Sequence, residues 1–237
     1  YDADGNLIGS LMNWAAHPTL LPAGNTLLTA DYPGAYYKAM DESLGGIHMY
    51  VNGAIGASIQ VLPVENPWVK WLLGTTNFDD WDDIGAVLME DALDLMENAK
   101  PVEHPSIWLQ ESRSVQVIVE NIAFWLASEV ELIPREVPPL GQYGETYMST
   151  FAIGPITFGT MPGEYGPNYS FILREILGGD AQVLIGLGMD WVGYAILPEQ
   201  YQSLPYLYER FLCPSSQAGE ELMAVYHEIW DPVHGQD

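Results

Sequence analysis

The chain has 237 residues, of which 48% are hydrophobic and 12% aromatic, so it can bury a sizeable core. It carries 32 acidic and seven basic side chains, a net charge of −25 at pH 7. This charge disfavours nucleic acid and anionic membrane surfaces as partners, because like charges repel. No apolar run approaches the roughly 20 residues that cross a bilayer, so we expect no transmembrane segment. The acidic residues are spread along the chain, which indicates a solvated surface and would suit a saline or extracellular setting.

The first predicted element is a strand that begins near Leu7 and ends at His17. Its apolar residues alternate loosely, and Pro18 cannot continue a ladder and favours an extended His17. Side chains at strand ends often bind metals or take part in catalysis. His17 could do so, or it could simply bond a neighbouring carbonyl.

A helix is predicted next, with Asp31 as its N-cap and Pro33 near its first turn. Gly45 and Gly46 should end it after Leu44. The apolar run 47–52 predicts a strand that leads into a glycine-rich turn over residues 52–58, where the backbone takes positive φ or approaches another segment closely. Residues 79–99 show the periodicity of an amphipathic helix with a solvated acidic face.

The second half of the chain predicts further strands and helices. In order, they are a strand at 107–119, a hairpin at 146–161 around Gly154-Pro155, a helix at 168–177, a strand at 181–188 and a helix at 218–230. The prolines of residues 121–144 indicate an excursion over the surface. Strands and helices alternate without a linker, so we expect one α/β domain over residues 1–237, with a mixed sheet and flanking helices.

Three predicted strands end in polar side chains, namely His17, Glu164 and Tyr194, and each of these follows an apolar run and lies beside Gly or Pro. An imidazole, a carboxylate and a phenol can all ligate zinc, which activates water and polarises carbonyl groups. Structural roles stay open for each residue. Glu164 could cap the following helix, and Tyr194 could be a packed aromatic with its hydroxyl bonded.

Several segments together resemble the neutral (non-lysosomal) ceramidases and their bacterial and archaeal relatives. In family order, they are Asn13-Trp14-Ala15-Ala16-His17-Pro18-Thr19, Thr29-Ala30-Asp31-Tyr32-Pro33-Gly34, Asn52-Gly53-Ala54-Ile55-Gly56, Pro162-Gly163-Glu164, and Asp190-Trp191-Val192-Gly193-Tyr194 followed by Pro198-Glu199-Gln200-Tyr201. The resemblance implies a single zinc held by His17, Glu164 and Tyr194. It also implies a zinc-bound water that attacks the amide carbonyl of an N-acyl sphingoid base, a tyrosine that steadies the oxyanion, and an extracellular or secreted location.

The chain departs from the family pattern in two places. The family's zinc has another histidine well upstream, whereas no histidine precedes His17 here. We therefore expect a C-terminal portion of a larger catalytic domain, incomplete at its N-terminus, whose partner is the missing N-terminal portion or another protein chain. The family also has an important serine after its Asn/Gly turn. Ile59 takes that place in gapless register, and Ser58 takes it only with a deletion, so the catalytic residue stays unassigned.

The leading hypothesis is a ceramidase-like zinc amidohydrolase, or a piece of one, that cleaves an amide bond in an N-acyl (sphingo)lipid or related substrate. The alternative is a ceramidase-like fold retained as a non-catalytic extracellular structural or assembly domain. The missing histidine and the altered serine motif favour that alternative. Its many Trp and Tyr residues could serve an interface.

Overall fold

The computed structural model describes residues 1–57, 60–102, 105–133 and 135–230. They group into two compact units. The N-terminal unit comprises Tyr1–Val51 and Ser58–Pro101, and the C-terminal unit comprises Asn52–Ala57 and Val102–Asp237. Whether the two units form one domain, as the sequence predicts, stays a prediction. No helix in the described ranges is both long and apolar enough to span a membrane.

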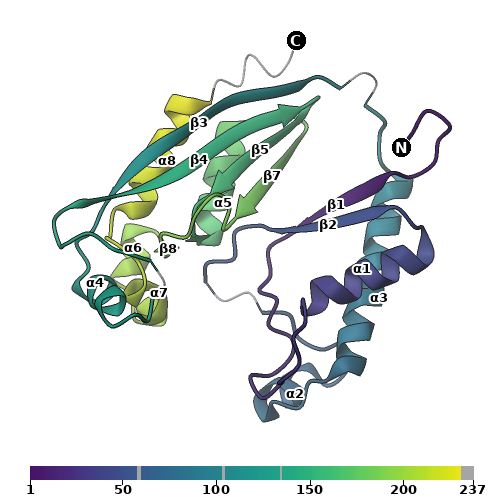
Figure 1. The fold of residues 1–237 in the computed structure, drawn as a ribbon, viewed down its shortest axis with the longest axis horizontal. Coiled ribbons are helices and arrows are strands. Elements are labelled where there is room, and N and C mark those ends of the chain that lie inside the picture. Colours follow the sequence, from purple (N-terminus) through teal and green to yellow (C-terminus); the bar gives the residue numbers. More distant parts are fainter. Residues whose placement is uncertain (58–59, 103–104, 134, 231–237) are drawn as a thin grey trace. The chain divides into compact units, whose positions relative to one another are not determined.

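The N-terminal unit combines a two-stranded sheet with helices (Figure 1). Its elements are β1 (Gly9–Trp14), α1 (Tyr32–Ser43), β2 (Ile47–Asn52), α2 (Pro67–Leu73) and α3 (Phe78–Glu97). The predicted bounds of α1, β2 and α3 agree with these to within about two residues, as is usual at helix ends. No element was predicted for α2.

Local signals determine where α1 begins and ends. The Asp31 carboxylate accepts a hydrogen bond from the Tyr32 N–H, and Pro33 occupies the first turn. At the other end, Gly45 and Gly46 take φ values of 64° and 94°. These angles are open to glycine at little cost, so the chain leaves the helix there, as predicted.

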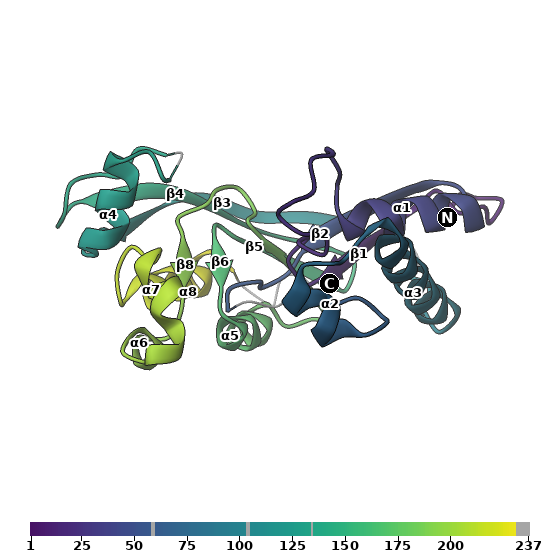
Figure 2. The same cartoon turned by 90° about the horizontal axis from the view of Figure 1, so that it is seen from below.

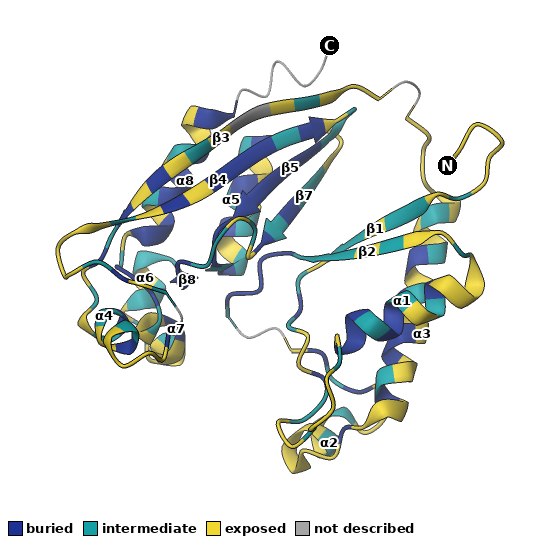
Figure 3. Ribbon diagram, viewed as in Figure 1, coloured by how far each residue is buried: buried dark blue, intermediate teal, exposed yellow. Residues whose placement is uncertain are grey.

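Aliphatic and aromatic side chains together fill the core of the N-terminal unit. The buried residues include Tyr32, Tyr36 and Met40 from α1 and Ile84, Leu88 and Ala92 from α3. Met12 and Tyr50 add contacts from the two strands. Figure 3 shows the buried faces of α1 and α3 and their exposed outer faces. The apolar spacing that predicted α3 includes Ile84 and Leu88, which lie on the buried side of this helix.

The C-terminal unit is built on a four-stranded sheet of order β3-β4-β5-β7. Its elements are β3 (Ile107–Ile118), α4 (Ile122–Glu129), β4 (Tyr143–Ile153), β5 (Ile156–Met161), β6 (Glu164–Tyr165), α5 (Pro167–Leu177), β7 (Ala181–Gly186), β8 (Tyr194–Ala195), α6 (Pro198–Tyr201), a 3-10 turn (Leu204–Tyr206), α7 (Leu207–Phe211) and α8 (Ala218–Ile229). The pairs β3–β4 and β4–β5 are antiparallel and β5–β7 is parallel. The predicted α/β class with a mixed sheet is confirmed.

Helices α5 and α8 cover one face of this sheet (Figures 1 and 2). The core beneath them contains three fully buried tyrosines, Tyr165, Tyr169 and Tyr226. Two of their hydroxyls bond within the unit, since Tyr226 donates to the Thr160 carbonyl and Tyr169 donates to Glu220 at 3.1 Å. Buried polar groups with partners cost little and help to specify one packing.

The proline-rich stretch 121–144 differs from its prediction. It contains α4, whose Phe124 and Ala127 are buried together with Ile133 and Val137. Asn121 caps α4 by accepting from the Ala123 N–H at 3.0 Å. The prolines lie after the helix, so they did not prevent its formation. The buried residues of the stretch join Val119 in a small core that packs against Trp191 and Leu212.

Candidate functional site

Glu164 and Tyr194 lie side by side on neighbouring strands. They are paired residues in the two-stranded parallel ladder of β6 and β8. Glu164 is half-buried and Tyr194 is buried. Burial, together with a hydrogen bond to the neighbouring Glu164 carboxylate, raises the pKa of the Tyr194 phenol. Two of the three predicted metal ligands therefore meet in the C-terminal unit.

A glycine precedes each of these two residues and permits their close approach. A Cβ at Gly163 would lie 2.5 Å from the Gly193 carbonyl oxygen, and Gly163 has a φ of 151°. The Glu164 N–H donates to the same carbonyl at 2.9 Å. The expectation that a strand ends at each of these residues is wrong, because each begins a two-residue strand of its own. Because these glycines have no Cβ, the two short strands can approach each other closely at this point.

The glycine-rich turn lies against the same ladder. The Gly56 N–H donates to the Tyr165 carbonyl at 2.9 Å, and a Cβ at Gly56 would lie 2.4 Å from the Glu164 carbonyl oxygen. The predicted close backbone approach is confirmed, and the approached segment contains Glu164. Ser58 and Ile59 fall outside the described residues, so the question of which one takes the family serine's place stays open.

His17 is not the last residue of β1, which ends at Trp14. Two tyrosine hydroxyls bind backbone carbonyls at and just after the end of this strand. Tyr50 donates to the Trp14 carbonyl at 2.8 Å, and Tyr32 donates to the Ala16 carbonyl at 2.7 Å. His17 instead forms a single parallel bridge with Gln60. His17 belongs to the N-terminal unit, so its convergence with Glu164 and Tyr194 stays a prediction.

The remaining histidines do not form an alternative metal centre in the described part of the chain. His48 is held by the Ser10 hydroxyl at 2.9 Å and the Gly45 carbonyl at 2.9 Å. His227 is exposed on α8, and His104 and His234 lie outside the described ranges. No cluster of three or more His, Cys, Asp or Glu within those ranges could hold a metal. The three predicted zinc ligands are not such a cluster, because one of them is a tyrosine. His17 also belongs to the N-terminal unit, whereas Glu164 and Tyr194 belong to the C-terminal unit.

The donor chemistry of the Glu164–Tyr194 pair fits a zinc ion. A carboxylate and a phenol supply two oxygen donors that already contact one another, and an imidazole would complete a mixed nitrogen and oxygen set. Ligating carboxylates are characteristically held by further hydrogen bonds. Glu164 has such a bond, because the Trp191 indole N–H donates to its Oε1 at 3.3 Å.

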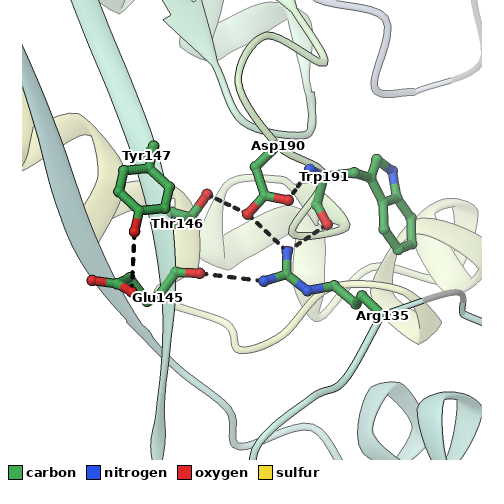
Figure 4. Close-up of polar contacts among 6 residues, drawn as sticks. All are labelled: Arg135, Glu145, Thr146, Tyr147, Asp190 and Trp191. Atoms are coloured by element: carbon green, nitrogen blue, oxygen red, sulfur yellow. Dashed lines mark hydrogen bonds and ion pairs between the residues drawn. The ribbon is translucent and has the colours of Figure 1, made fainter.

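A polar cluster that sequence reasoning missed holds Trp191 in place (Figure 4). The Arg135 guanidinium donates to Asp190 Oδ2 at 3.0 Å and to the Trp191 carbonyl at 2.8 Å. Thr146 also donates to Asp190 Oδ2, at 2.9 Å. The segment Asp190-Trp191 was recognised as a motif, but nothing in the sequence connected it with Arg135, 55 residues away.

Aromatic and aliphatic side chains surround this cluster. Tyr208 packs edge-on against Tyr194 with ring centroids 5.7 Å apart, and Phe124 lies 6.5 Å from the Trp191 ring. A cavity of about 560 Å³ opens beside them. Its lining consists of Leu132, Ile133, Arg135, Asp190, Trp191, Tyr208, Phe211 and Leu212. The mixture of apolar walls and a few charged groups is typical of sites for small organic ligands.

Comparison with solved structures identifies the fold. The chain matches neutral ceramidase from Pseudomonas aeruginosa with a TM-score of 0.71 and 14% identity, over 96% of this chain and 44% of that one. It matches a second structure, described as ceramidase complexed with C2, with a TM-score of 0.69 and 13% identity, over 96% and 46%. No protein-family model and no curated protein sequence matches. The chain therefore spans less than half the length of these two proteins, and over nearly all of its own length it has the fold of neutral ceramidase.

Proposed function

We propose that this chain is part of a ceramidase-like zinc amidohydrolase that cleaves the amide bond of an N-acyl (sphingo)lipid or a related substrate. The observation that carries the proposal is the direct pairing of Glu164 with Tyr194 in a chain with the neutral ceramidase fold. His17, Glu164 and Tyr194 are the proposed ligands. Zinc, when bound, would activate water and polarise the scissile carbonyl.

The residues of this chain have distinct proposed roles. Glu164 supplies a carboxylate oxygen whose orientation depends on the Trp191 indole. Tyr194 supplies a phenol oxygen, and its position beside the carboxylate suits it to hydrogen-bond the negative charge that develops on an amide carbonyl oxygen. His17 supplies an imidazole nitrogen. The cavity beside Trp191 and Tyr208 has the apolar lining that an acyl chain or sphingoid tail requires.

Zinc content and amide hydrolysis test this proposal together. We expect the natively purified protein to contain zinc by elemental analysis and to release fatty acid from a fluorescent short-chain ceramide. Glu164→Gln and Tyr194→Phe should lower both zinc content and turnover. Glu228→Gln is the matched control, because Glu228 is 64% exposed and pairs with Arg113 on the surface. Zinc-free protein, or turnover unchanged by Glu164→Gln, would contradict the proposal.

The second candidate function is a non-catalytic extracellular domain with a ceramidase-like fold. It is favoured by Ile59, which stands in gapless register where the family has its serine and can neither donate nor accept a proton. General acid–base partners contribute about 10²- to 10⁴-fold in rate. Bound zinc with no turnover on any N-acyl substrate would support this function, and turnover abolished by Ser58→Ala would instead identify Ser58 as the replacement.

We further propose that the chain packs against another polypeptide segment, such as the part of a ceramidase-like domain that it does not span. Several apolar side chains of the N-terminal unit are more than half exposed, among them Ile8, Ile47, Met49, Trp68 and Leu72. Exposed apolar side chains that form a contiguous patch commonly mark an interface. Sedimentation analysis should show self-association or a bound partner, whereas a stable monomer that binds no hydrophobic dye would count against the proposal.

A further inference from the structure

The turn that contains Asp190 and Trp191 is cross-linked by one guanidinium group. Nη1 of Arg135 reaches both a side chain and a backbone carbonyl of this turn, at 3.0 Å and 2.8 Å. Oδ1 of Asp190 accepts from the Trp191 N–H at 2.7 Å. Asp190 and Arg135 are both about three-quarters buried, with side-chain exposures of 28% and 26%. Charge-assisted hydrogen bonds in such surroundings are stronger and more directional than those at an open surface.

Arg135 is itself held from two sides. Its Nη2 donates to the Glu145 carbonyl on β4 at 3.2 Å. Its own carbonyl accepts from the Ser128 hydroxyl of α4 at 2.8 Å, and the same hydroxyl accepts from the Val137 N–H at 3.2 Å. The guanidinium therefore connects β4, the segment after α4 and the Asp190–Trp191 turn. A lysine could not reproduce this, because it lacks the planar fork of donors.

The indole of Trp191 extends this network to Glu164. Its N–H donates to Glu164 Oε1 at 3.3 Å, while its ring packs against Phe124. Each link from Arg135 through Asp190 and Trp191 to Glu164 is thus a hydrogen bond within the C-terminal unit. A carboxylate oriented by a fixed donor has fewer conformations to lose when it binds a cation.

We infer that Arg135 and Asp190 are positioning residues that hold the Trp191 indole against Glu164 and thereby orient this carboxylate. They act on Glu164 through Trp191, and neither of them is a proposed metal ligand. The consequence for metal binding rests on the proposed function, whereas the orientation of the indole is a property of the folded chain alone. The two can therefore be tested separately.

The first experiment requires no metal. In the metal-free whole protein labelled with ¹⁵N, the Trp191 indole resonance is assigned by its loss in Trp191→Phe. Glu164→Gln should move this proton upfield, because a neutral amide is a weaker acceptor than a carboxylate. Arg135→Met and Asp190→Asn should move it in the same direction or broaden it. Arg174→Met is the matched control, since Arg174 donates to the Gln182 carbonyl instead, and it should leave the resonance in place.

The second experiment measures the zinc affinity of the same proteins by competition with a chromophoric chelator. Trp191→Phe keeps an aromatic ring beside Phe124 but removes the indole N–H together with part of the ring system, so it should fold and bind zinc about 10- to 100-fold more weakly. Arg135→Met should weaken zinc binding to a similar extent. Arg135→Lys keeps the positive charge but lacks the planar fork of guanidinium donors. Its zinc affinity should therefore fall between those of Arg135→Met and the unaltered protein. Arg174→Met should bind like the unaltered protein.

The possible outcomes separate the two proposals. If the Trp191 indole resonance keeps its position in both Glu164→Gln and Arg135→Met, the inference is overturned, whatever the zinc affinities are. Zinc affinity unchanged by Trp191→Phe in a protein that does bind zinc would overturn the positioning role and leave the proposed function standing. If the unaltered protein binds no zinc, the proposed function fails. The resonance experiment would still decide whether the network orients Glu164.

Discussion

At the scale of single residues, Asp31 shows how one side chain can organise both a helix and a loop. Besides capping α1, its carboxylate accepts the backbone N–H groups of Leu20 and Leu21 at 2.9 Å and 3.0 Å. It does so from a backbone conformation with a positive φ of 54°, and it is 7% exposed. The loop after His17 is therefore attached to the start of α1 by a buried carboxylate.

We expect Asp31→Ala to destabilise the protein by about 2–4 kcal/mol. The loss of a helix cap costs about 1 kcal/mol, and buried N–H groups left without acceptors cost about 1–3 kcal/mol each. Urea denaturation followed by circular dichroism measures the change in the free energy of unfolding. The control is Asp82→Ala, which removes a surface ion pair with Lys38 and should cost less than about 1 kcal/mol. Equal effects of the two substitutions would contradict this account of Asp31.

Cys213 provides a pH-dependent prediction. Burial raises the pKa of its thiol from 9.0 to about 12, and the thiol donates to the Ser215 carbonyl at 2.9 Å. We expect no reaction with a thiol reagent at pH 8 in the folded protein and rapid reaction in guanidinium chloride, because only the thiolate of an accessible cysteine reacts. Reaction in the folded state at the rate of a free thiol would contradict the prediction.

The same pKa shift links Cys213 to alkaline stability. A group with a raised folded pKa contributes stability that is present below pH 9 and is lost as the pH rises towards 12. Cys213→Ser keeps a donor to the Ser215 carbonyl but does not ionise. The stability of the unaltered protein relative to Cys213→Ser should therefore fall by up to about 1.4 kcal/mol per pH unit across this range. Parallel pH profiles for the two proteins would show that the thiol is not the cause.

At the scale of elements, glycines permit close contacts that a larger residue would prevent. Gly85 of α3 faces Ala35 of α1, where an added Cβ would lie 2.6 Å from the Ala35 Cβ and 2.7 Å from its carbonyl. The Trp81 indole N–H on α3 also donates to the Asp31 carbonyl at 2.6 Å. Helices α1 and α3 therefore pack with their backbones unusually close together.

We expect Gly85→Ala to destabilise the N-terminal unit by about 1–3 kcal/mol, as overpacking does. Helix propensity alone predicts the opposite sign, a gain of about 1 kcal/mol. The sign of the change in melting temperature therefore distinguishes packing from propensity. Gly24→Ala is the control, because no atom lies within 4 Å of its added Cβ. A higher melting temperature for Gly85→Ala would mean that the helices separate easily.

At the scale of the whole molecule, the excess of acidic side chains dominates the electrostatics. Lysine and arginine pairs in the described ranges include Lys38–Asp82, Lys70–Asp80, Arg113–Glu228 and Arg135–Asp190. With 32 acidic and only seven basic side chains, most carboxylates cannot have a cationic partner. Mutual repulsion among them opposes the compact state, and salt screens it.

The melting temperature should therefore rise as salt increases from about 0.01 M to about 1 M, over which the Debye length falls from roughly 30 Å to roughly 3 Å. Differential scanning calorimetry in sodium chloride measures this rise. A parallel series in sucrose controls for general solute exclusion, which stabilises without screening charge. A melting temperature that stays flat or falls in sodium chloride would show that the carboxylates are locally compensated.

The sequence by itself determined the features that depend on neighbouring residues. The Asp31 cap, the glycines after α1, the hairpin at Gly154-Pro155 and the α/β class were predictable, because capping, turn conformation and apolar periodicity are local properties. The predicted ligands Glu164 and Tyr194 also came from local motifs. Their pairing did not, since Glu164 and Tyr194 are 30 positions apart in sequence and their strands meet through glycine contacts.

Only the tertiary structure decided which groups, distant in sequence, bind the backbone carbonyls near His17 and which ones contact the candidate site. Strand β1 ends at Trp14, before His17, and the hydroxyls of Tyr50 and Tyr32 occupy the carbonyls of Trp14 and Ala16. The Trp191 indole donates to Glu164, and Arg135 binds the Trp191 carbonyl. Arg135 comes from the proline-rich stretch in which α4 was not predicted. Such hydrogen bonds join groups far apart in the chain, and no local pattern of residue types specifies which donor will meet which acceptor. Folding selects them through the packing of the whole unit.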